Sequence, residues 1–230
     1  KDEGPQHKVK ISKGFWLSKY EITQLQWEAV MGNNPSQYKG PKRPVEYVSW
    51  YSCRRFTEKL TKSGADKVRF RIPSEAEWEY ACRAGTKSAL YSGAVNLSLG
   101  KKSSSLEPIA WYASNSREDD PKKLGFKVYS NEDSLGSVRQ THPVGEKKGN
   151  AWGLHDMIGN VCEWTNDWYS ESYYSAKSKV DPLGPSSGEM RVIRGGSWSD
   201  EAKYCRSAAR NWLASNYAAT YLGLRLLMEN

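Results

Sequence analysis

Apolar and polar residues alternate near the N-terminus of the chain, as is typical of β-strands. Within residues 7–22, Val9 and Ile11 are followed by Phe15 and Leu17 with polar residues between them. We predict two short strands here, separated by a turn at Lys13-Gly14. A further short strand is predicted over residues 68–73, where Pro73 ends the pattern.

Helical spacing first appears after Thr23, which is expected to be an N-cap, and ends at residues 32–35 with Gly-Asn-Asn-Pro. A second helix is predicted over residues 51–62, with Ser63-Gly64 at its end. Ser74 and Glu77 form a capping box that starts a third helix. The residues of this third helix expected to face the core are Trp78, Ala81 and Cys82.

The composition predicts a loop-rich fold with few long helices. The 230 residues include 19 Gly, 10 Pro, 10 Trp and 14 Tyr but only four Phe, so the core is expected to consist of aromatic rings that carry polar groups. Residues 88–140 are rich in Ser, Lys and Asp, with few apolar residues beyond Trp111, Phe126 and Val128. We predict long surface loops there, and no linker or repeat divides the chain.

Net charge is +8, but the lysines are scattered and form no basic helix or groove lined with aromatic residues. We therefore expect no nucleic acid partner. No run of 18 apolar residues occurs, so membrane insertion by this segment is not expected. We find no targeting signal in this sequence.

Four blocks of sequence carry a family resemblance. They are Lys19-Tyr20-Glu21-Ile22-Thr23, residues 71–86 (Arg-Ile-Pro-Ser-Glu-Ala-Glu-Trp and onwards), residues 150–164, and Arg194-Gly195-Gly196-Ser197-Trp198 with the closing Leu222-Gly223-Leu224-Arg225-Leu226. Together they resemble the formylglycine-generating enzyme (sulfatase-modifying factor) family, a branch of the C-type lectin fold. The resemblance implies an α+β, C-type lectin-like, loop-rich single domain over residues 1–230, with short strands and a few short helices.

Cys53, Cys82, Cys162 and Cys205 are spaced too widely for a zinc ribbon or a Cys-x-x-Cys redox pair. Four cysteines allow three complete disulfide pairings, and each cysteine can equally be a small buried apolar residue. We expect all four to be free and buried.

The resemblance to oxygen-dependent members of the family implies a copper site made by two cysteines five positions apart, which soft Cu(I) requires. In this chain Asp200 stands at the first of these positions and Cys205 at the second, while Ser197 keeps the family serine. Cys162 replaces a pocket tryptophan of the family. We therefore expect no copper and no formylglycine-generating activity, with the copper-dependent oxidase, or another enzyme of the sulfatase-modifying-factor type, as the alternative.

Calcium is the metal that the resemblance implies. In calcium-binding family members the matching positions are Asp156 and Glu163, which would supply side-chain oxygens, and Gly159 and Val161, which would supply carbonyl oxygens. The alternative is that Glu163 is a hydrogen-bonded buried carboxylate without a metal. The chain has three histidines, His7, His142 and His155, and we expect His142 and His155 as turn residues rather than as metal ligands.

Residues 195–226 combine a sharp corner at Gly195-Gly196 with a following stretch of Tyr, Trp and small polar residues. Aromatic residues spaced by small ones are typical of recognition surfaces such as antibody paratopes. The layout resembles the variable proteins of diversity-generating retroelements, of the type found in Treponema, in which adenine-directed mutagenesis changes surface residues just before the C-terminus.

The resemblance implies a non-catalytic display protein that binds a protein or another surface ligand through this segment. It also implies a cell-surface or extracellular location, and we expect a monomer. A regulatory or chaperone-like protein that binds through residues 88–140 is a further hypothesis. Tyr204, Trp212 and Tyr221 are the predicted anchors. The complete set of predicted contact residues is Ser199, Asp200, Glu201, Lys203, Tyr204, Ala209, Asn211, Trp212, Ser215, Tyr217, Ala219, Thr220 and Tyr221.

Overall fold

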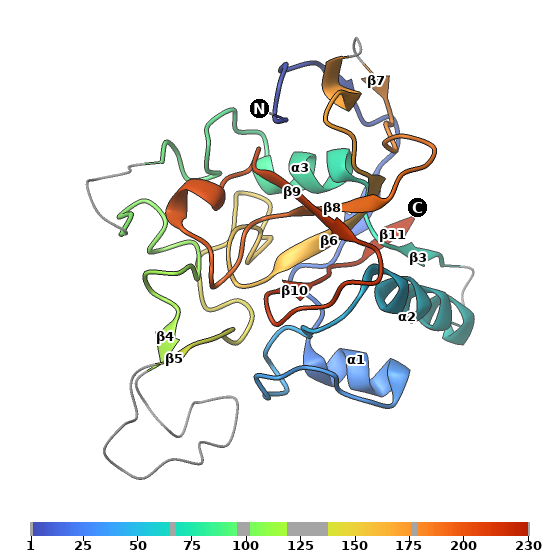
Figure 1. The fold of residues 1–230 in the computed structure, drawn as a ribbon, viewed down its shortest axis with the longest axis vertical. Coiled ribbons are helices and arrows are strands. Elements are labelled where there is room, and N and C mark those ends of the chain that lie inside the picture. Colours follow the sequence, from blue (N-terminus) through green and yellow to red (C-terminus); the bar gives the residue numbers. More distant parts are fainter. Residues whose placement is uncertain (1, 65–67, 96–101, 119–137, 176–178, 230) are drawn as a thin grey trace.

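The computed structural model describes residues 2–64, 68–95, 102–118, 138–175 and 179–229. Its α-helices in these ranges are α1 (Gln24–Met31), α2 (Trp50–Ser63) and α3 (Glu75–Arg83), and its strands are short (Figure 1). The α+β, loop-rich architecture expected from the sequence is confirmed.

The helix ends follow the sequence signals. Thr23 caps α1 and Ser74 caps α3, each in a reciprocal capping box with the third residue of its helix. Ser49 caps α2 by accepting a hydrogen bond from the Ser52 amide. Gly32 ends α1 at a positive φ of 78°, which glycine adopts at low cost. The helix predictions are therefore correct to within one residue at most ends.

The central sheet has the strand order β10-β6-β8-β9 and is made from the second half of the chain. Its strands are β6 (Cys162–Trp168), β8 (Met190–Arg194), β9 (Arg210–Ala214) and β10 (Leu222–Gly223). Antiparallel pairing places Glu163 opposite Arg194 and Val192 opposite Trp212, whereas β10 runs parallel to β6. The two edge strands are therefore β10 and β9, and both belong to the predicted recognition segment.

The second sheet joins the two ends of the chain. Its middle strand β11 (Leu227–Glu229) pairs antiparallel with β2 (Phe15–Leu17) on one side and β3 (Phe70–Arg71) on the other. Two small pairs complete the strands, β1 (Val9–Lys10) with β7 (Lys179–Val180) and β4 (Arg117–Glu118) with β5 (Val138–Arg139). Both predicted N-terminal strands exist, but each pairs with a distant partner and not with the other.

The interior contains two apolar clusters. In the first, the ring of Trp27 stacks on Phe56 with centroids 5.0 Å apart, and Trp164 is fully buried beside them. The second cluster forms around Trp78 and Leu106. Most buried indoles find an acceptor: Trp164 donates to the Val48 carbonyl at 3.0 Å. Aromatic rings with satisfied polar groups are what the composition predicts.

The expectation that residues 88–140 are only surface loops is wrong for part of that stretch. Leu90, Leu106 and Tyr112 are fully buried in the second cluster, and Ile109 is nearly so. These apolar residues occur singly among polar ones, so no periodic pattern reveals them. The predicted anchors Phe126 and Val128 lie outside the described residues.

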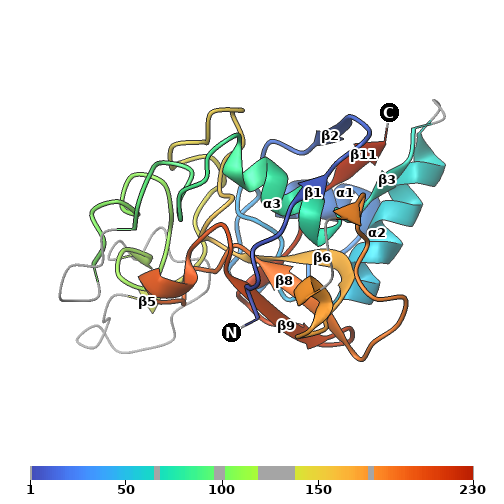
Figure 2. The same cartoon turned by 90° about the horizontal axis from the view of Figure 1, so that it is seen from above.

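The loops gather at one end of the molecule and α2 lies at the other, with the central sheet between them (Figure 2). All four cysteines are free and buried, as expected. In the described ranges no helix has the length and apolar character needed to cross a membrane.

Candidate functional site

Strand β8 leads directly into the corner at Gly195 and Gly196, where φ is +95° and +72°. A Cβ atom on Gly196 would lie 2.9 Å from the Cys205 Sγ atom, and one on Gly195 would lie 3.3 Å from the Met157 carbonyl oxygen. Both the backbone conformation and the packing therefore require glycine here. The corner sets the direction in which the recognition segment leaves the sheet.

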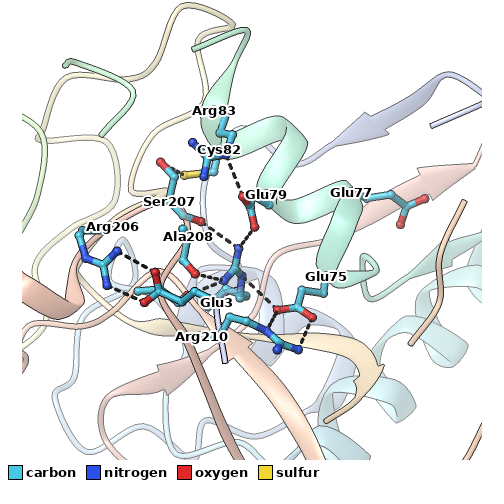
Figure 3. Close-up of polar contacts among 12 residues, drawn as sticks. Glu3, Glu75, Glu77, Glu79, Cys82, Arg83, Arg206, Ser207, Ala208 and Arg210 are labelled. Carbon is cyan, nitrogen blue, oxygen red and sulfur yellow. Dashed lines mark hydrogen bonds and ion pairs between the residues drawn. The ribbon is translucent and has the colours of Figure 1, made fainter. Parts of the chain in front are cut away.

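A buried arginine holds the next part of the segment in place (Figure 3). The Arg194 guanidinium is inaccessible to solvent and donates to the carbonyl oxygens of Ser207, Ala208 and Ala209 at 2.8, 2.9 and 2.6 Å. It also pairs with the Glu79 carboxylate of α3. Burial by itself would lower the pKa of Arg194, but the nearby glutamates raise it above its usual value. Arg194 therefore remains charged and fixes three consecutive carbonyls.

Two further arginines of the segment are paired with acidic residues from distant parts of the chain (Figure 3). Arg210 makes a bidentate ion pair with Glu75 at 2.6 and 2.9 Å, at the first turn of α3. Arg206 pairs with Glu3 at 2.9 and 2.6 Å. Planar bidentate pairs restrict both partners. The backbone of residues 205–210 is thus anchored to α3 and to the N-terminal residues.

The predicted contact residues differ in exposure. Those that are exposed are Ser199, Glu201, Lys203, Tyr204, Asn211, Trp212 and Tyr217, and those that are half-buried are Asp200, Ala209, Thr220 and Tyr221.

Two of the predicted contact residues, Ser215 and Ala219, are buried, and for these the prediction is wrong. Ala219 packs into the first apolar cluster, and its carbonyl accepts the Tyr47 amide at 2.9 Å. Ser215 lies at the start of the turn after β9, with its hydroxyl inside. Small residues in loops fit inside or outside a fold equally well, which is why composition did not distinguish the two cases.

A small hollow of about 100 Å³ lies at the centre of the segment and is hereafter the C-terminal hollow. Four predicted contact residues line it: Asp200, Tyr204, Ala209 and Asn211. Trp212 follows Asn211 on β9, and successive residues of a strand point to opposite faces. Its ring instead stacks on Tyr169 at 3.9 Å between centroids. The predicted anchor Trp212 therefore lies on a different face from the hollow.

Asp200 is hydrogen-bonded at the wall of the hollow. Its Oδ2 atom accepts the Ser197 hydroxyl at 2.8 Å and lies 3.8 Å from the Cys162 Sγ atom. Burial raises the pKa of Cys162 and Cys205 well above the usual thiol range, and the Asp200 carboxylate raises both further. A thiolate pair, which Cu(I) requires, is disfavoured by this environment.

The four predicted calcium ligands lie in one turn and the start of β6, but the oxygens of Glu163 are already occupied. Arg225 donates Nε to Oε2 and Nη2 to Oε1, both at 2.7 Å, and Trp78 donates Nε1 to Oε2 at 2.7 Å. A cation bound to Glu163 would therefore face the Arg225 guanidinium. Of the two alternatives for Glu163, the geometry fits the hydrogen-bonded carboxylate.

One carboxylate oxygen of Asp156 can still accept a hydrogen bond or a cation. Its Oδ2 atom accepts the Gly145 amide at 2.7 Å, while the buried Oδ1 atom has no partner in the described structure. Burial raises its pKa to about 6. Gly159 has φ +82°, and a Cβ atom there would lie 2.3 Å from the Trp111 carbonyl oxygen, so both the backbone and the packing require glycine. Val161 donates its amide to the carboxylate of Glu21 at 3.0 Å. Among the described residues no three His, Cys, Asp or Glu side chains group as metal ligands, so a Ca²⁺ site at this turn would depend on backbone carbonyl oxygens.

The histidines differ in environment. His142 is buried, stacks on Trp111 with centroids 3.7 Å apart, and contacts the Ser116 carbonyl at 3.0 Å. His155 contacts the Lys147 carbonyl at 2.8 Å, and His7 is near the N-terminus. Each histidine contacts a backbone carbonyl, but none of the three lies in a turn, so the expectation of turns for His142 and His155 is wrong.

Sequence reasoning missed two features of the site. The arginine pairs with Glu3, Glu75 and Glu79 could not be found, because the partners lie more than 100 residues away in the sequence. Tyr47 is half-exposed at a positive φ of 63° beside Ala219, outside the segment that composition pointed to. An aromatic residue at positive φ is an uncommon conformation that often marks a functional position.

The sequence matches the FGE-sulfatase family, described as the sulfatase-modifying factor enzyme 1-like domain, over residues 1–230. The chain belongs to this family. The chaperone protein LppX of Paenibacillus barcinonensis is 34% identical over 217 residues, which cover 80% of this chain and 69% of that protein. The formylglycine-generating enzyme of Bos taurus is 32% identical over 220 residues, or 94% of this chain. The match covers 51% of the bovine enzyme, so the chain spans about half its length.

Among solved structures, Treponema denticola variable protein 1 superposes with a TM-score of 0.79 at 30% identity. The superposition covers 100% of this chain and 89% of that chain. Both resemblances drawn from the sequence, to the formylglycine-generating enzyme family and to a Treponema variable protein, are confirmed.

Proposed function

We propose that this protein is a non-catalytic ligand-binding protein whose residues 195–226 form its recognition surface. The observation that carries the proposal is the C-terminal hollow, where Asp200, Tyr204 and Asn211 surround a concave site on a fixed backbone. Tyr204 is 53% exposed although its neighbours Ala202 and Cys205 are buried. An exposed aromatic side chain on an anchored backbone is the arrangement from which binding hot spots are made.

A rigid backbone supports this proposal energetically. The ion pairs of Arg194, Arg206 and Arg210 order residues 205–210 before any ligand arrives. Ordering an interface on binding costs free energy, so a surface that is already ordered keeps more of its contact energy as affinity. Because the exposed side chains make few core contacts, they can be exchanged while the frame remains. That property suits the diversified segment of a retroelement variable protein.

The chemistry of the hollow indicates the kind of group that it binds. Within the described residues Asp200 receives hydrogen bonds only at Oδ2, so Oδ1 is available as an acceptor. Tyr204 and Asn211 add polar groups at its edge. We infer that the ligand, a protein or another molecule at a cell surface, places a hydrogen-bond donor or a cationic group at Asp200. We further propose that the protein is extracellular or at the cell surface and acts as a monomer.

The copper-dependent oxidase is the second candidate, favoured by the formylglycine-generating enzymes among the relatives. Two observations argue against oxidase activity. Asp200 occupies the position of the first family cysteine, and burial raises the thiol pKa of Cys205. A copper-loaded sample with a cysteine-containing peptide and oxygen should therefore yield no aldehyde product. Formation of formylglycine that is lost in Cys205→Ser would establish the enzyme instead.

Binding is tested on an array of purified cell-surface proteins and glycans. The wild type is compared with Tyr204→Ala and Tyr217→Ala and with the control Trp16→Ala, whose ring is 63% exposed on β2. A hot spot costs about 2 kcal/mol on truncation, so Tyr204→Ala should weaken binding about 30-fold.

Trp16→Ala should bind as the wild type does. Binding that survives both tyrosine substitutions, or that maps to residues 102–118, would contradict the proposed surface. The latter result would favour the chaperone-like hypothesis, to which the name of the Paenibacillus relative also points.

A further inference from the structure

Arg191 on β8 is a buried arginine with an unusual environment. Its guanidinium carbon lies 3.4 Å from the ring centroid of Trp168 and 3.9 Å from that of Trp50, so the group lies between two indoles. The residue is only 8% exposed. Nη1 donates to the Asn166 carbonyl, while the buried Nε has no partner in the described structure.

Arg191 differs in this respect from other arginines of the fold. Arg71, Arg194, Arg206, Arg210 and Arg225 each form an ion pair with a glutamate. In the described part of the chain Arg191 forms none. A buried charge without a counter-ion is costly, and cation–π contacts recover only part of that cost.

Asp167 is the acidic residue that acts most strongly on Arg191, but it does not neutralise the guanidinium. Burial raises the pKa of Asp167 to about 8, so this carboxyl group is mostly protonated at neutral pH. Burial also lowers the pKa of Arg191 to about 10, which leaves the guanidinium charged at neutral pH. The contacts of the Arg191 guanidinium in the described structure are therefore two indole faces and the Asn166 carbonyl, and none of them is an ion pair.

Arg191 lines a groove of about 920 Å³. The groove lies between α2, β3 and the loop at residues 183–186, at the end of the molecule where α2 and β3 are side by side (Figure 1). Its volume is in the range of sites that hold ligands of several hundred daltons. None of its lining residues belongs to the C-terminal hollow.

The walls of the groove combine positive charge with apolar patches. Arg54, Lys62 and Arg69 add positive charge, and Phe70 and Leu183 add apolar surface. Glu58 also lines the groove and pairs with Arg54 at 2.8 Å. This carboxylate would repel a polyanion such as a nucleic acid. The lining thus fits a ligand that has one or two carboxylates next to uncharged, apolar groups.

We propose that this groove binds a short acidic peptide segment of a partner protein, with a Glu or Asp carboxylate placed against the Arg191 guanidinium. The indoles of Trp50 and Trp168 hold the guanidinium plane, and this planar fork of donors matches a carboxylate better than a single ammonium group would. The apolar residues Phe70 and Leu183 receive the neighbouring side chains of the segment. This site is independent of the surface proposed above.

The test uses the whole chain and three probes: acetyl-Leu-Glu-Leu-amide, the matching glutamine peptide, and sodium acetate. Binding is followed by NMR, through the Arg191 Nε–H signal and the indole N–H signals of Trp50 and Trp168. The glutamate peptide should shift these signals and bind about ten times more tightly than the glutamine peptide. Added salt should weaken its binding.

Two variants give the test its controls. Arg69→Gln changes a side chain that is 71% exposed at the rim of the groove, so the fold should remain. This variant should weaken binding of the glutamate peptide about threefold. Lys203→Gln, on the C-terminal segment, should leave binding unchanged. Arg191→Lys keeps the charge but loses the fork, and should reduce binding about tenfold.

Several results would overturn the proposal. Equal binding of the two peptides would show an apolar groove without carboxylate recognition. Acetate that binds as tightly as the glutamate peptide would show a simple anion site. Absence of binding by the glutamate peptide, or binding that Arg191→Lys leaves unchanged, would also contradict it.

Discussion

Replacing Arg194 by methionine should destabilise the fold more than most single substitutions. The change removes a guanidinium that donates hydrogen bonds to three backbone carbonyls and to the Glu79 carboxylate. The Arg194 side chain is shielded from solvent. Removing one partner of a buried ion pair costs about 3–5 kcal/mol, because the remaining groups lose their hydrogen bonds in a dry site. We expect a loss of about 4 kcal/mol in the free energy of unfolding.

The matched control is Arg206→Gln, which breaks the pair with Glu3. Both side chains of that pair are partly exposed, at 27% and 33%, so its loss should cost no more than about 1 kcal/mol. Urea unfolding followed by tryptophan fluorescence measures both variants. With a slope of about 3 kcal/mol per molar urea, the midpoint of Arg194→Met should fall by about 1.3 M.

Equal urea midpoints for the two variants would show that the buried Arg194 contacts stabilise the fold no more than the exposed Arg206 pair does. A loss of less than about 1 kcal/mol in the free energy of unfolding for Arg194→Met would also contradict the prediction, because the buried pairs would then not be what orders residues 205–210.

Three other predictions concern stability and thiol chemistry. Gly196→Ala should lower the free energy of unfolding in urea by about 2 kcal/mol, because the new Cβ atom adds backbone strain at φ +72° and a close contact with Cys205. The control Gly153→Ala has a similar φ of +76° but open space around it, so it should lower that free energy by only about 1 kcal/mol. Burial lowers the pKa of His142 to about 4, so this histidine should contribute a loss of about 3 kcal/mol in stability as pH falls from 6.5 to 4, which His142→Gln should lack in parallel unfolding curves. The four cysteines should react with a thiol reagent only after unfolding, and rapid reaction of the native protein would show that they are not buried.

The sign of the pH prediction follows from which state binds more protons. Between pH 4 and 6.5 an unfolded histidine takes up a proton that the buried His142 does not, so unfolding becomes more favourable as pH falls. A His142→Gln variant whose stability falls as steeply as that of the wild type in this window would contradict the assignment.

Local features of the fold could be predicted from the sequence, since the signals lie within a few residues of one another. The capping boxes at Thr23 and Ser74 are examples, and the positions of α1 and α3 followed from them. Strand pairing could not be predicted, because it depends on contacts between distant segments. The pairing of β2 with β11 joins residues more than 200 positions apart.

The candidate site was predictable in outline but not in detail. Composition identified the segment and its exposed Tyr204, yet gave no means of separating Ser199, which is exposed, from Ser215, which is buried. The groove at Arg191 was missed because Trp50 and Trp168 are separated by more than 100 residues. In both cases the missing information is which side of the backbone faces the interior.

The central claim is that residues 195–226 are an exchangeable recognition surface on a fixed frame. Sequencing the coding region and its downstream neighbourhood in several isolates tests it most directly. We expect a near-identical repeat of the coding segment that differs from it only at adenines. Among isolates, substitutions should occur at exposed positions such as Tyr204 and Asn211 and not at the buried Arg194, Cys205 and Arg225. An identical segment in every isolate without such a repeat, or substitutions that fall equally on the buried positions, would contradict it.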